Sequence, residues 1–352
     1  MKKYSLLVVL AMLLSCTSLL AREYLGSSSL IRYVGRIELS GSQSRLWTSG
    51  SYAEFGFNGD TCTLVLEDQF RYGVMHSYVE VVIDNETPIR LRLNERINTL
   101  VFVPKKHRKQ HRILVCKDTE TGTGFVGVNS IVVDSMFQLP ERKKYLFEFF
   151  GDSITCGASS DTSSVGCHLG RWEDQHNAYM SYGAQASRMS DADWVLSSVS
   201  GIGLMHSCCG MTVVMPEVWD KMGMRDDSID YHFDQYRPAA IFVCLGQNDG
   251  MQDTIAFQKN YISFLQKIRT KYNNQPIVLL TSPMSDSKLR PYLEYQLSMV
   301  VEQSKQLGIQ DVHTYFFKGT YTNGCDWHPS VTEHTAIAKE LVSFLKSKRV
   351  LH

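Results

Sequence analysis

The spacing pattern of hydrophobic residues changes once along this chain, near Pro140, and this change constrains the fold more than any other feature. Before Pro140, apolar and polar residues alternate in many short segments, as they do in half-buried strands. The clearest of these segments are residues 52–57, 62–67, 78–83, 99–103, 112–116 and 129–133. Because no helical pattern interrupts them, residues 22–140 are predicted to form a β-sandwich domain that resembles a jelly roll.

After Pro140, predicted strands and helices alternate. Apolar residues recur with a 3.6-residue period around residues 257–268, 293–307 and 337–345, which predicts helices, and residues 194–196 and 276–280 read as strands between helices. Such alternation is typical of a parallel sheet with helices on both faces. We therefore expect an α/β chain with two domains, in which a doubly wound parallel-sheet domain at residues 141–352 follows the sandwich.

The N-terminus has the features of an export signal at residues 1–21. Lys2 and Lys3 precede an apolar run at residues 6–14 that is too short to span a bilayer. Two outcomes remain open, namely cleavage after Ala21 or lipid attachment at Cys16, where Leu-Leu-Ser-Cys resembles a bacterial lipoprotein box. Both predict an exported protein that is periplasmic, secreted or lipid-anchored at the cell surface, and a lipid on Cys16 is the only membrane link expected.

Charge and cysteine content narrow the possible partners and sites. Lys plus Arg equals Asp plus Glu at 36 each, which gives no net field to attract nucleic acid, so no nucleic-acid partner is expected. Cysteines in apolar strand patterns are predicted to be core residues, namely Cys62, Cys116 and Cys244. An exported chain permits disulfides, and one structural bridge is expected among the loop cysteines, which are Cys156, Cys167, Cys208, Cys209 and Cys325.

A candidate nucleophile follows the apolar run at residues 145–150. The sequence Gly-Asp-Ser-Ile at residues 151–154 places Ser153 where a buried strand ends, at the rim of a sheet. A second apolar run, residues 241–245, leads into Gly-Gln-Asn-Asp at residues 246–249, in which Asn248 supplies an amide donor suited to an oxyanion hole. Asp152 and Asp249 are expected to hold their loops by hydrogen bonds.

The acid–base partner is predicted near the C-terminus, in Gly-Cys-Asp-Trp-His-Pro at residues 324–329. Pro329 keeps His328 out of a helix, and a spacing of two in an extended segment points both side chains to the same side. Asp326 is therefore expected to accept a hydrogen bond from Nδ1 of His328 while Nε2 faces Ser153. Trp327 is the predicted sugar-stacking residue, with Trp172 as a second candidate.

These residues resemble the SGNH (GDSL-type) hydrolase superfamily, which is named for serine, glycine, asparagine and histidine in four blocks. Residues 151–155 resemble the serine block, 200–203 the glycine block, 246–249 the Gly-x-Asn-Asp block, and 326–329 a short form of the histidine block. Within the superfamily the chain is most similar to carbohydrate esterase family 2, whose members are acetyl esterases of plant polysaccharides with a β-sandwich ahead of the hydrolase domain.

The resemblance implies an esterase that removes O-acetyl groups from xylan or glucomannan through an acyl-enzyme, without a metal or cofactor. It implies that Ser153 is the nucleophile, His328 the base and Asp326 its orienting group, although a backbone carbonyl replaces the carboxylate in some members. The amides of Ser153 and Gly201 and the side chain of Asn248 would form the oxyanion hole, with Gly203 as the alternative to Gly201.

Two other functions remain open from the sequence. A lipase, lysophospholipase or thioesterase of the same superfamily would use identical catalytic residues, and would differ in preferring long acyl chains. A protein that binds carbohydrate without catalysis would also fit the two-domain pattern, but it would have no need of a serine, an amide donor and a histidine together.

Overall fold

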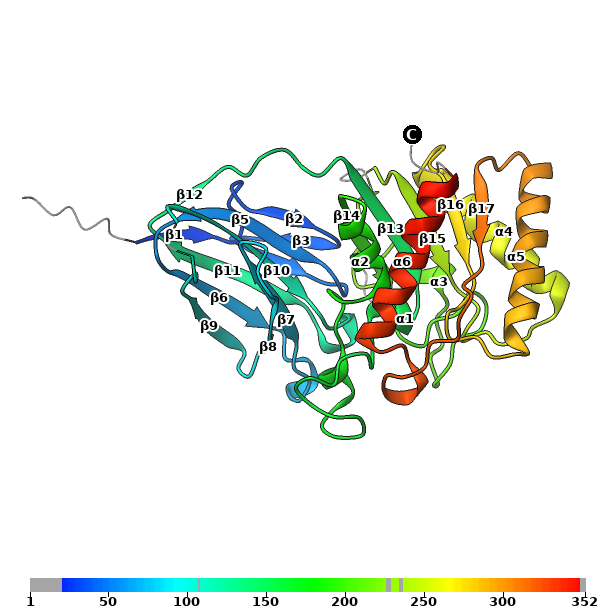
Figure 1. The fold of residues 1–352 in the computed structure, drawn as a ribbon, viewed down its shortest axis with the longest axis horizontal. Coiled ribbons are helices and arrows are strands. Elements are labelled where there is room, and N and C mark those ends of the chain that lie inside the picture. The colour runs from blue at the N-terminus through cyan, green and yellow to red at the C-terminus, as the bar shows by residue number, and fades with distance from the viewer. Residues whose placement is uncertain (1–20, 107, 226–228, 234–236, 349–352) are drawn as a thin grey trace, which may run out of the picture.

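The computed structural model describes residues 21–106, 108–225, 229–233 and 237–348. Residues 1–20 of the expected signal peptide, which include Cys16, lie outside this range. Two parts follow each other along the chain, a layered set of antiparallel strands and then a parallel sheet flanked by helices (Figure 1). This order of parts is the one predicted from the change in hydrophobic spacing near Pro140.

The first part is a sandwich of two antiparallel sheets. One sheet contains β1 (Arg22–Leu25), β3 (Ile37–Ser40), β4 (Gln43–Leu46), β6 (Cys62–Asp68), β9 (Ile97–Phe102) and β11 (Val126–Val133). The other contains β2 (Arg32–Val34), β5 (Tyr52–Asn58), β7 (Tyr78–Ile83), β8 (Ile89–Arg92), β10 (Gln110–Lys117) and β12 (Ser135–Phe137). Alternate residues of β6, such as Leu64 and Leu66, pack with Phe55 and Val81 of the opposite sheet in one core. The predicted sandwich is confirmed.

The second part is a five-stranded parallel sheet in the order β14-β13-β15-β16-β17. Its strands are β13 (Tyr145–Gly151), β14 (Ala192–Ser198), β15 (Ala240–Cys244), β16 (Ile277–Leu280) and β17 (Val312–Tyr315). In chain order this is 2-1-3-4-5, a doubly wound arrangement whose direction reverses between β13 and β15. Ligands of such sheets bind outside the carboxyl ends of the strands at that reversal.

Helices cover both faces of the parallel sheet. They are α1 (Ser153–Cys156), α2 (Tyr182–Met189), α3 (Met215–Val218), α4 (Thr254–Lys271), α5 (Leu289–Gln306) and α6 (Val331–Lys348), and this part also contains the single turns η3 (Trp172–Gln175) and η5 (Cys325–Trp327). Two further single turns, η1 (Arg71–Gly73) and η2 (Thr121–Thr123), lie in the sandwich part. α2 and α6 share one core with Val278 of β16, whereas α4 and α5 share the other with Ile277 and Leu279. The three predicted amphipathic helices therefore correspond to α4, α5 and α6.

The two parts are joined by buried polar contacts. Arg36 of the sandwich is fully buried and donates to the backbone oxygens of Lys221 (2.6 Å) and Trp219 (2.7 Å). Tyr52 Oη donates to Asp193 at 2.6 Å on the edge strand β14. Because a buried cation without partners is costly, the fully paired Arg36 fixes how the sandwich sits against the parallel sheet.

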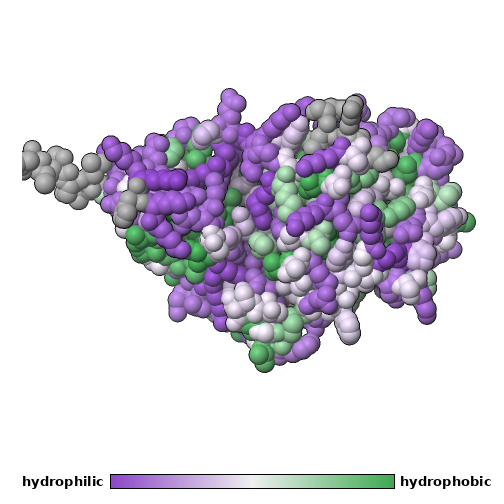
Figure 2. All heavy atoms as spheres, viewed as in Figure 1, coloured by the Kyte–Doolittle hydropathy of each residue, from purple (hydrophilic) through white to green (hydrophobic). Residues whose placement is uncertain are grey.

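On the face drawn in Figure 2, hydrophobic residues reach the surface in small separate groups among hydrophilic ones. Among the helices of the described part, none has the length and apolar character needed to cross a bilayer.

Candidate active site

Ser153 lies directly after the carboxyl end of β13, where the chain turns sharply into α1. The turn depends on Gly151, because a Cβ atom there would lie 2.1 Å from Oγ1 of Thr155. The carboxylate of Asp152 caps α1 by accepting from the amide of Ile154 at 3.0 Å. Ser153 Oγ lies 2.8 Å from Nε2 of His328, although 175 residues separate the two in sequence. The predicted pairing of serine and histidine is therefore present.

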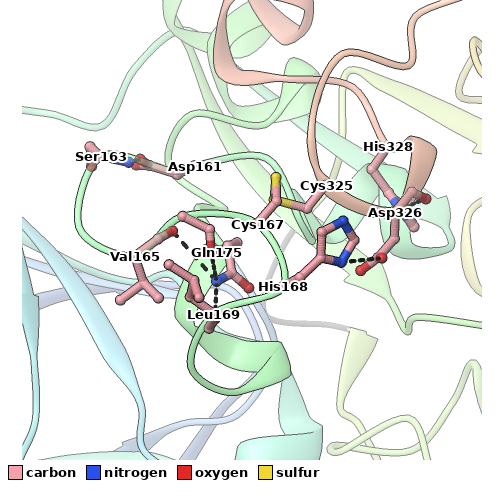
Figure 3. The surroundings of a disulfide bond; sticks show 11 residues. Asp161, Ser163, Val165, Cys167, His168, Leu169, Gln175, Cys325, Asp326 and His328 are labelled. Atoms are coloured by element: carbon pink, nitrogen blue, oxygen red, sulfur yellow. Dashed lines mark hydrogen bonds and ion pairs between the residues drawn. A yellow bond between two sulfur atoms is a disulfide. The ribbon is translucent and has the colours of Figure 1, made fainter.

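The group that orients His328 differs from the prediction. Nδ1 of His328 lies 2.9 Å from the backbone oxygen of Asp326. A carbonyl oxygen only accepts, so Nδ1 carries the proton and Nε2 is left as the acceptor that faces Ser153. The carboxylate of Asp326 points instead toward His168, at 3.8 Å (Figure 3), and it is exposed to solvent. The predicted hydrogen bond from His328 to the Asp326 carboxylate is wrong.

Backbone conformation explains this correction. The prediction assumed an extended segment, in which residues two apart share a side. Instead, Asp326 (φ 50°) and Trp327 (φ 61°) both adopt the left-handed conformation within the η5 turn. This turn directs the Asp326 carbonyl rather than its side chain at the imidazole, and it leaves Trp327 78% exposed.

A disulfide between Cys167 and Cys325 holds the histidine loop. It joins the segment before η3 to the first residue of η5, across 158 residues of sequence (Figure 3). The expected structural bridge among the loop cysteines is thus present. A second bridge joins the adjacent residues Cys208 and Cys209. Cys62, Cys116 and Cys244 are buried free thiols, as expected of core residues.

Two of the predicted oxyanion donors line the same pocket as Ser153, namely Gly201 and Asn248. Gly201 has φ 81°, a left-handed conformation that favours glycine, and the described residues contain no acceptor bonded to its amide. The amide of Gly203 already donates to Ser207 Oγ at 3.0 Å, which favours Gly201 as the donor. Asn248 Nδ2 donates to the backbone oxygen of Ile202 (2.9 Å) and, at a longer 3.3 Å, to Asp152.

The two aspartates beside these residues hold loops, as expected. Asp249 accepts from the backbone amides of Leu204, Met205 and His206 at 2.8–2.9 Å, so the loop after β15 is tied to the loop that carries Gly201. Burial, reinforced by the nearby charge of Asp249, raises the pKa of Asp152 to about 7, against the hydrogen bond from Ile154. Asp152 is therefore a second titratable group beside the nucleophile.

The pocket over Ser153 has a volume of about 550 Å³, within the range of small-molecule sites. Trp172 and Arg225 lie in its wall, whereas the predicted stacking residue Trp327 does not. Arg225 is backed by Glu120 of the sandwich part, at 3.6 Å. Neither Arg225 nor Glu120 was predicted from the sequence, because neither belongs to a local motif and only the docking of the two parts brings them together.

Two family models match the chain. The carbohydrate esterase 2 N-terminal family matches residues 33–141. The GDSL-like lipase/acylhydrolase family matches residues 149–331, which include all four blocks of the predicted site.

Similar proteins match along nearly the whole chain. An acetylxylan esterase/glucomannan deacetylase from Cellvibrio japonicus is 25% identical, with 99% of each chain covered. Cellulase/esterase CelE from Acetivibrio thermocellus is 24% identical over 90% of this chain, which spans 39% of that longer protein. A family two carbohydrate esterase from Clostridium thermocellum, solved in complex with cellohexaose, has a TM-score of 0.82 at 23% identity, covering 91% of this chain and 99% of that one.

Proposed function

The chain belongs to the GDSL-like lipase/acylhydrolase family, with the N-terminal domain of carbohydrate esterase family 2, and we propose that it removes O-acetyl groups from plant polysaccharide. It is a carboxylic ester hydrolase. The observation that carries the proposal is the 2.8 Å contact between Ser153 Oγ and His328 Nε2 at the floor of a pocket large enough for a sugar. The naming of a full-length relative as an acetylxylan esterase/glucomannan deacetylase supports acetyl as the acyl group.

In the proposed reaction, Ser153 Oγ attacks the acetyl carbonyl carbon while its proton passes to Nε2 of His328. The tetrahedral intermediate then collapses, the bond from the acetyl carbon to the sugar oxygen breaks, and His328 returns the proton to that oxygen. Water, deprotonated by His328, attacks acetyl-Ser153 in the same way and releases acetate. The backbone oxygen of Asp326 keeps the proton on Nδ1 throughout.

Charge that develops on the acetyl oxygen is stabilised by the amides of Ser153 and Gly201 and the side chain of Asn248. Nδ2 of Asn248 has two hydrogens, and both are engaged in the free enzyme. The longer bond, to Asp152, is the one that the oxyanion replaces, since hydrogen bonds of a free site often tighten only with substrate present.

Acetate release from acetylated xylan, glucomannan and pectin, compared side by side, tests this function. We expect release from xylan or glucomannan by the native protein and none by Ser153→Ala. A comparison of acetyl with longer acyl esters tests the alternative of a lipase, lysophospholipase or thioesterase. A preference for chains of about eight carbons or more would contradict the acetyl proposal, and xylan binding without hydrolysis of any ester would indicate a binding protein.

Asp326→Asn is expected to retain kcat within about tenfold of the native value, because the backbone oxygen that orients His328 stays in place. Loss of a carboxylate that holds the histidine of a triad lowers kcat by about 10⁴-fold. Asparagine also tolerates the left-handed conformation of residue 326, so the turn is preserved. Steady-state kinetics with 4-nitrophenyl acetate measure the effect, and a loss of about a thousandfold with unchanged thermal stability would restore the carboxylate as the orienting group.

The acid limb of the pH profile is expected to have its midpoint below pH 6.5. Burial lowers the pKa of His328 from its ordinary 6.5, although the hydrogen bond to Asp326 acts in the opposite direction. His328 acts as a base only when neutral, so kcat/KM is full above this lowered pKa and falls as the pH drops through it. Measurement of kcat/KM from about pH 4 to about pH 8 locates the midpoint. A midpoint above 6.5 in both the native enzyme and Asp152→Asn, which lacks the Asp152 titration, would contradict this assignment.

We also propose that residues 1–21 are a signal peptide and that residues 22–140 and 141–352 are the two domains of an exported enzyme. The basic and apolar pattern at the N-terminus supports export. Mass spectrometry of the mature protein distinguishes a chain that begins after Ala21 from one that begins at a lipid-modified Cys16. An intact Met1 on the mature protein would contradict both outcomes.

A further inference from the structure

Arg225 is the one side chain with a permanent charge that lines the pocket over Ser153, among the residues that the structure describes. No carboxylate lines this pocket in the described part of the chain. The side chain of Arg225 is 30% exposed, so part of its guanidinium faces the space where a substrate would sit. A fixed cation at this point attracts an anionic group on the substrate more strongly than it attracts a neutral hydroxyl.

Among the described residues, none accepts a hydrogen bond from Arg225. The guanidinium makes no hydrogen bond to any other described residue, and its Nε is buried without a partner. Its Nη2 lies 3.6 Å from Oε2 of Glu120, an ion pair that is longer than a hydrogen bond. Because Nε is buried, a ligand in the pocket would meet the guanidinium through Nη1 and Nη2, and neither of these donates to another described residue.

Glu120 orients Arg225 from behind. It is fully buried, it accepts from the amide of Ser200 at 2.9 Å, and its other oxygen lies 3.6 Å from Nε2 of His176. Burial alone would raise the pKa of Glu120, but His176, Arg225 and Ser200 outweigh burial and lower the pKa to about 2. The carboxylate therefore stays ionised and fixes the guanidinium without filling its outward donors.

An aromatic face lies beside the cation. A Cβ atom on Gly122 would lie 3.2 Å from Nη2 of Arg225 and 3.4 Å from Cζ3 of Trp172, so both side chains pack over this one glycine. Trp172 is 39% exposed and lines the same pocket. A sugar ring stacked on the indole would present its substituents to the guanidinium, whose planar fork matches a carboxylate.

We propose that Arg225 binds the carboxylate of a uronic acid residue beside the acetylated sugar, which makes acetylated acidic polysaccharides the preferred substrates. This inference rests on the proposed esterase function and specifies its substrate class. Glucuronic acid on xylan and galacturonic acid in pectin share the carboxylate that the guanidinium recognises. The two sources differ in the chain that carries the acid, so the experiment includes both.

The first test compares the native enzyme on acetylated acidic xylo-oligosaccharides and on the same oligosaccharides after reduction of the carboxyl group to an alcohol. We expect kcat/KM to be about ten- to a hundredfold higher for the acidic form, the range for a hydrogen bond to a charged group. The preference should shrink with added salt. Acetylated galacturonan oligosaccharides and their reduced form are tested in the same way, and equal rates for both acidic and reduced pairs would overturn the proposal.

Variants then assign the preference to Arg225. Arg225→Gln is expected to bring the ratio of acidic to reduced substrate close to one, and Arg225→Lys, which keeps the charge but lacks the fork, to give an intermediate ratio. Arg96→Gln, at an exposed arginine on the sandwich, is the matched control and should keep the native ratio. A native ratio in a folded Arg225→Gln would contradict the assignment.

A binding measurement separates this inference from the esterase proposal. Calorimetry with Ser153→Ala and deacetylated oligosaccharides reports carboxylate recognition without turnover. If Ser153→Ala binds the acidic form more tightly but the native protein releases no acetate from any substrate, the esterase proposal alone is contradicted. If Ser153→Ala binds the acidic and reduced forms with equal affinity while the native protein releases acetate, only the uronic acid proposal is contradicted.

Discussion

Replacing Ser153 with alanine is expected to lower kcat for acetyl esters by about five to six orders of magnitude, the loss seen when a serine hydrolase loses its nucleophile. Ser153 Oγ is the oxygen at 2.8 Å from Nε2 of His328, and without it no acyl-enzyme forms. The small residual rate would come from binding and from the oxyanion donors, which stay in place. Stopped-flow release of nitrophenol from 4-nitrophenyl acetate measures both the burst and the steady rate.

The substitution should leave the fold intact, because Ser153 Oγ makes its hydrogen bond to His328 and to no other described residue. Ser298→Ala, which removes a hydroxyl from the exposed face of α5, is the matched control and should keep the native burst. Mass spectrometry of the native enzyme during turnover should locate the acetyl group on Ser153. A Ser153→Ala protein that keeps a tenth of native activity would move the nucleophile elsewhere.

The architecture was largely predictable because its long elements repeat a clear pattern. α4, α5 and α6 are each 18 residues long, so several turns of apolar residues mark the buried stripe of each helix. β5, β6 and β10 carry seven or eight residues, enough for an alternation to stand out. The short sandwich strands β1, β2, β3, β4, β8 and β12, of three or four residues each, were not predicted because so few residues do not establish a period.

Within the site, the residues that could be predicted are those marked by the sequence directly around them. Ser153 and Asn248 could be predicted because each follows a buried strand at the edge where parallel strands end. The prediction for the Asp326 carboxylate was wrong because Asp326 and Trp327, neither of which is a glycine, both adopt the left-handed conformation. This conformation is uncommon for such residues, so the sequence does not indicate it. Arg225, Glu120 and Trp172 come together only when the sandwich docks on the parallel sheet. No local pattern marks Arg225 or Glu120, whereas Trp172 was a stacking candidate because it is a large aromatic residue.

Replacing Asn248 with alanine is expected to lower kcat by about two to three orders of magnitude, or about 2.7–4 kcal/mol of transition-state stabilisation, with little change in KM. The reason is that its Nδ2 lies in the pocket wall with Ser153 and Gly201, and its longer hydrogen bond is free to pass to the oxyanion. An interaction made only in the transition state lowers kcat and kcat/KM together. Steady-state kinetics on 4-nitrophenyl acetate and on acetylated xylan measure the change, and activity within tenfold of native would remove Asn248 from the oxyanion hole.

The shorter hydrogen bond of Asn248, 2.9 Å to the oxygen of Ile202, raises a competing cause, since its loss could displace the loop that carries Gly201. Gln252→Ala is the matched control, because it truncates an amide side chain in the same loop that donates to the backbone of Asp249 and lies outside the pocket wall. If the oxyanion role is correct, Gln252→Ala keeps kcat near the native value and Asn248→Ala does not. If loop displacement is the cause, both variants lose activity, and their loss of activity follows their loss of thermal stability.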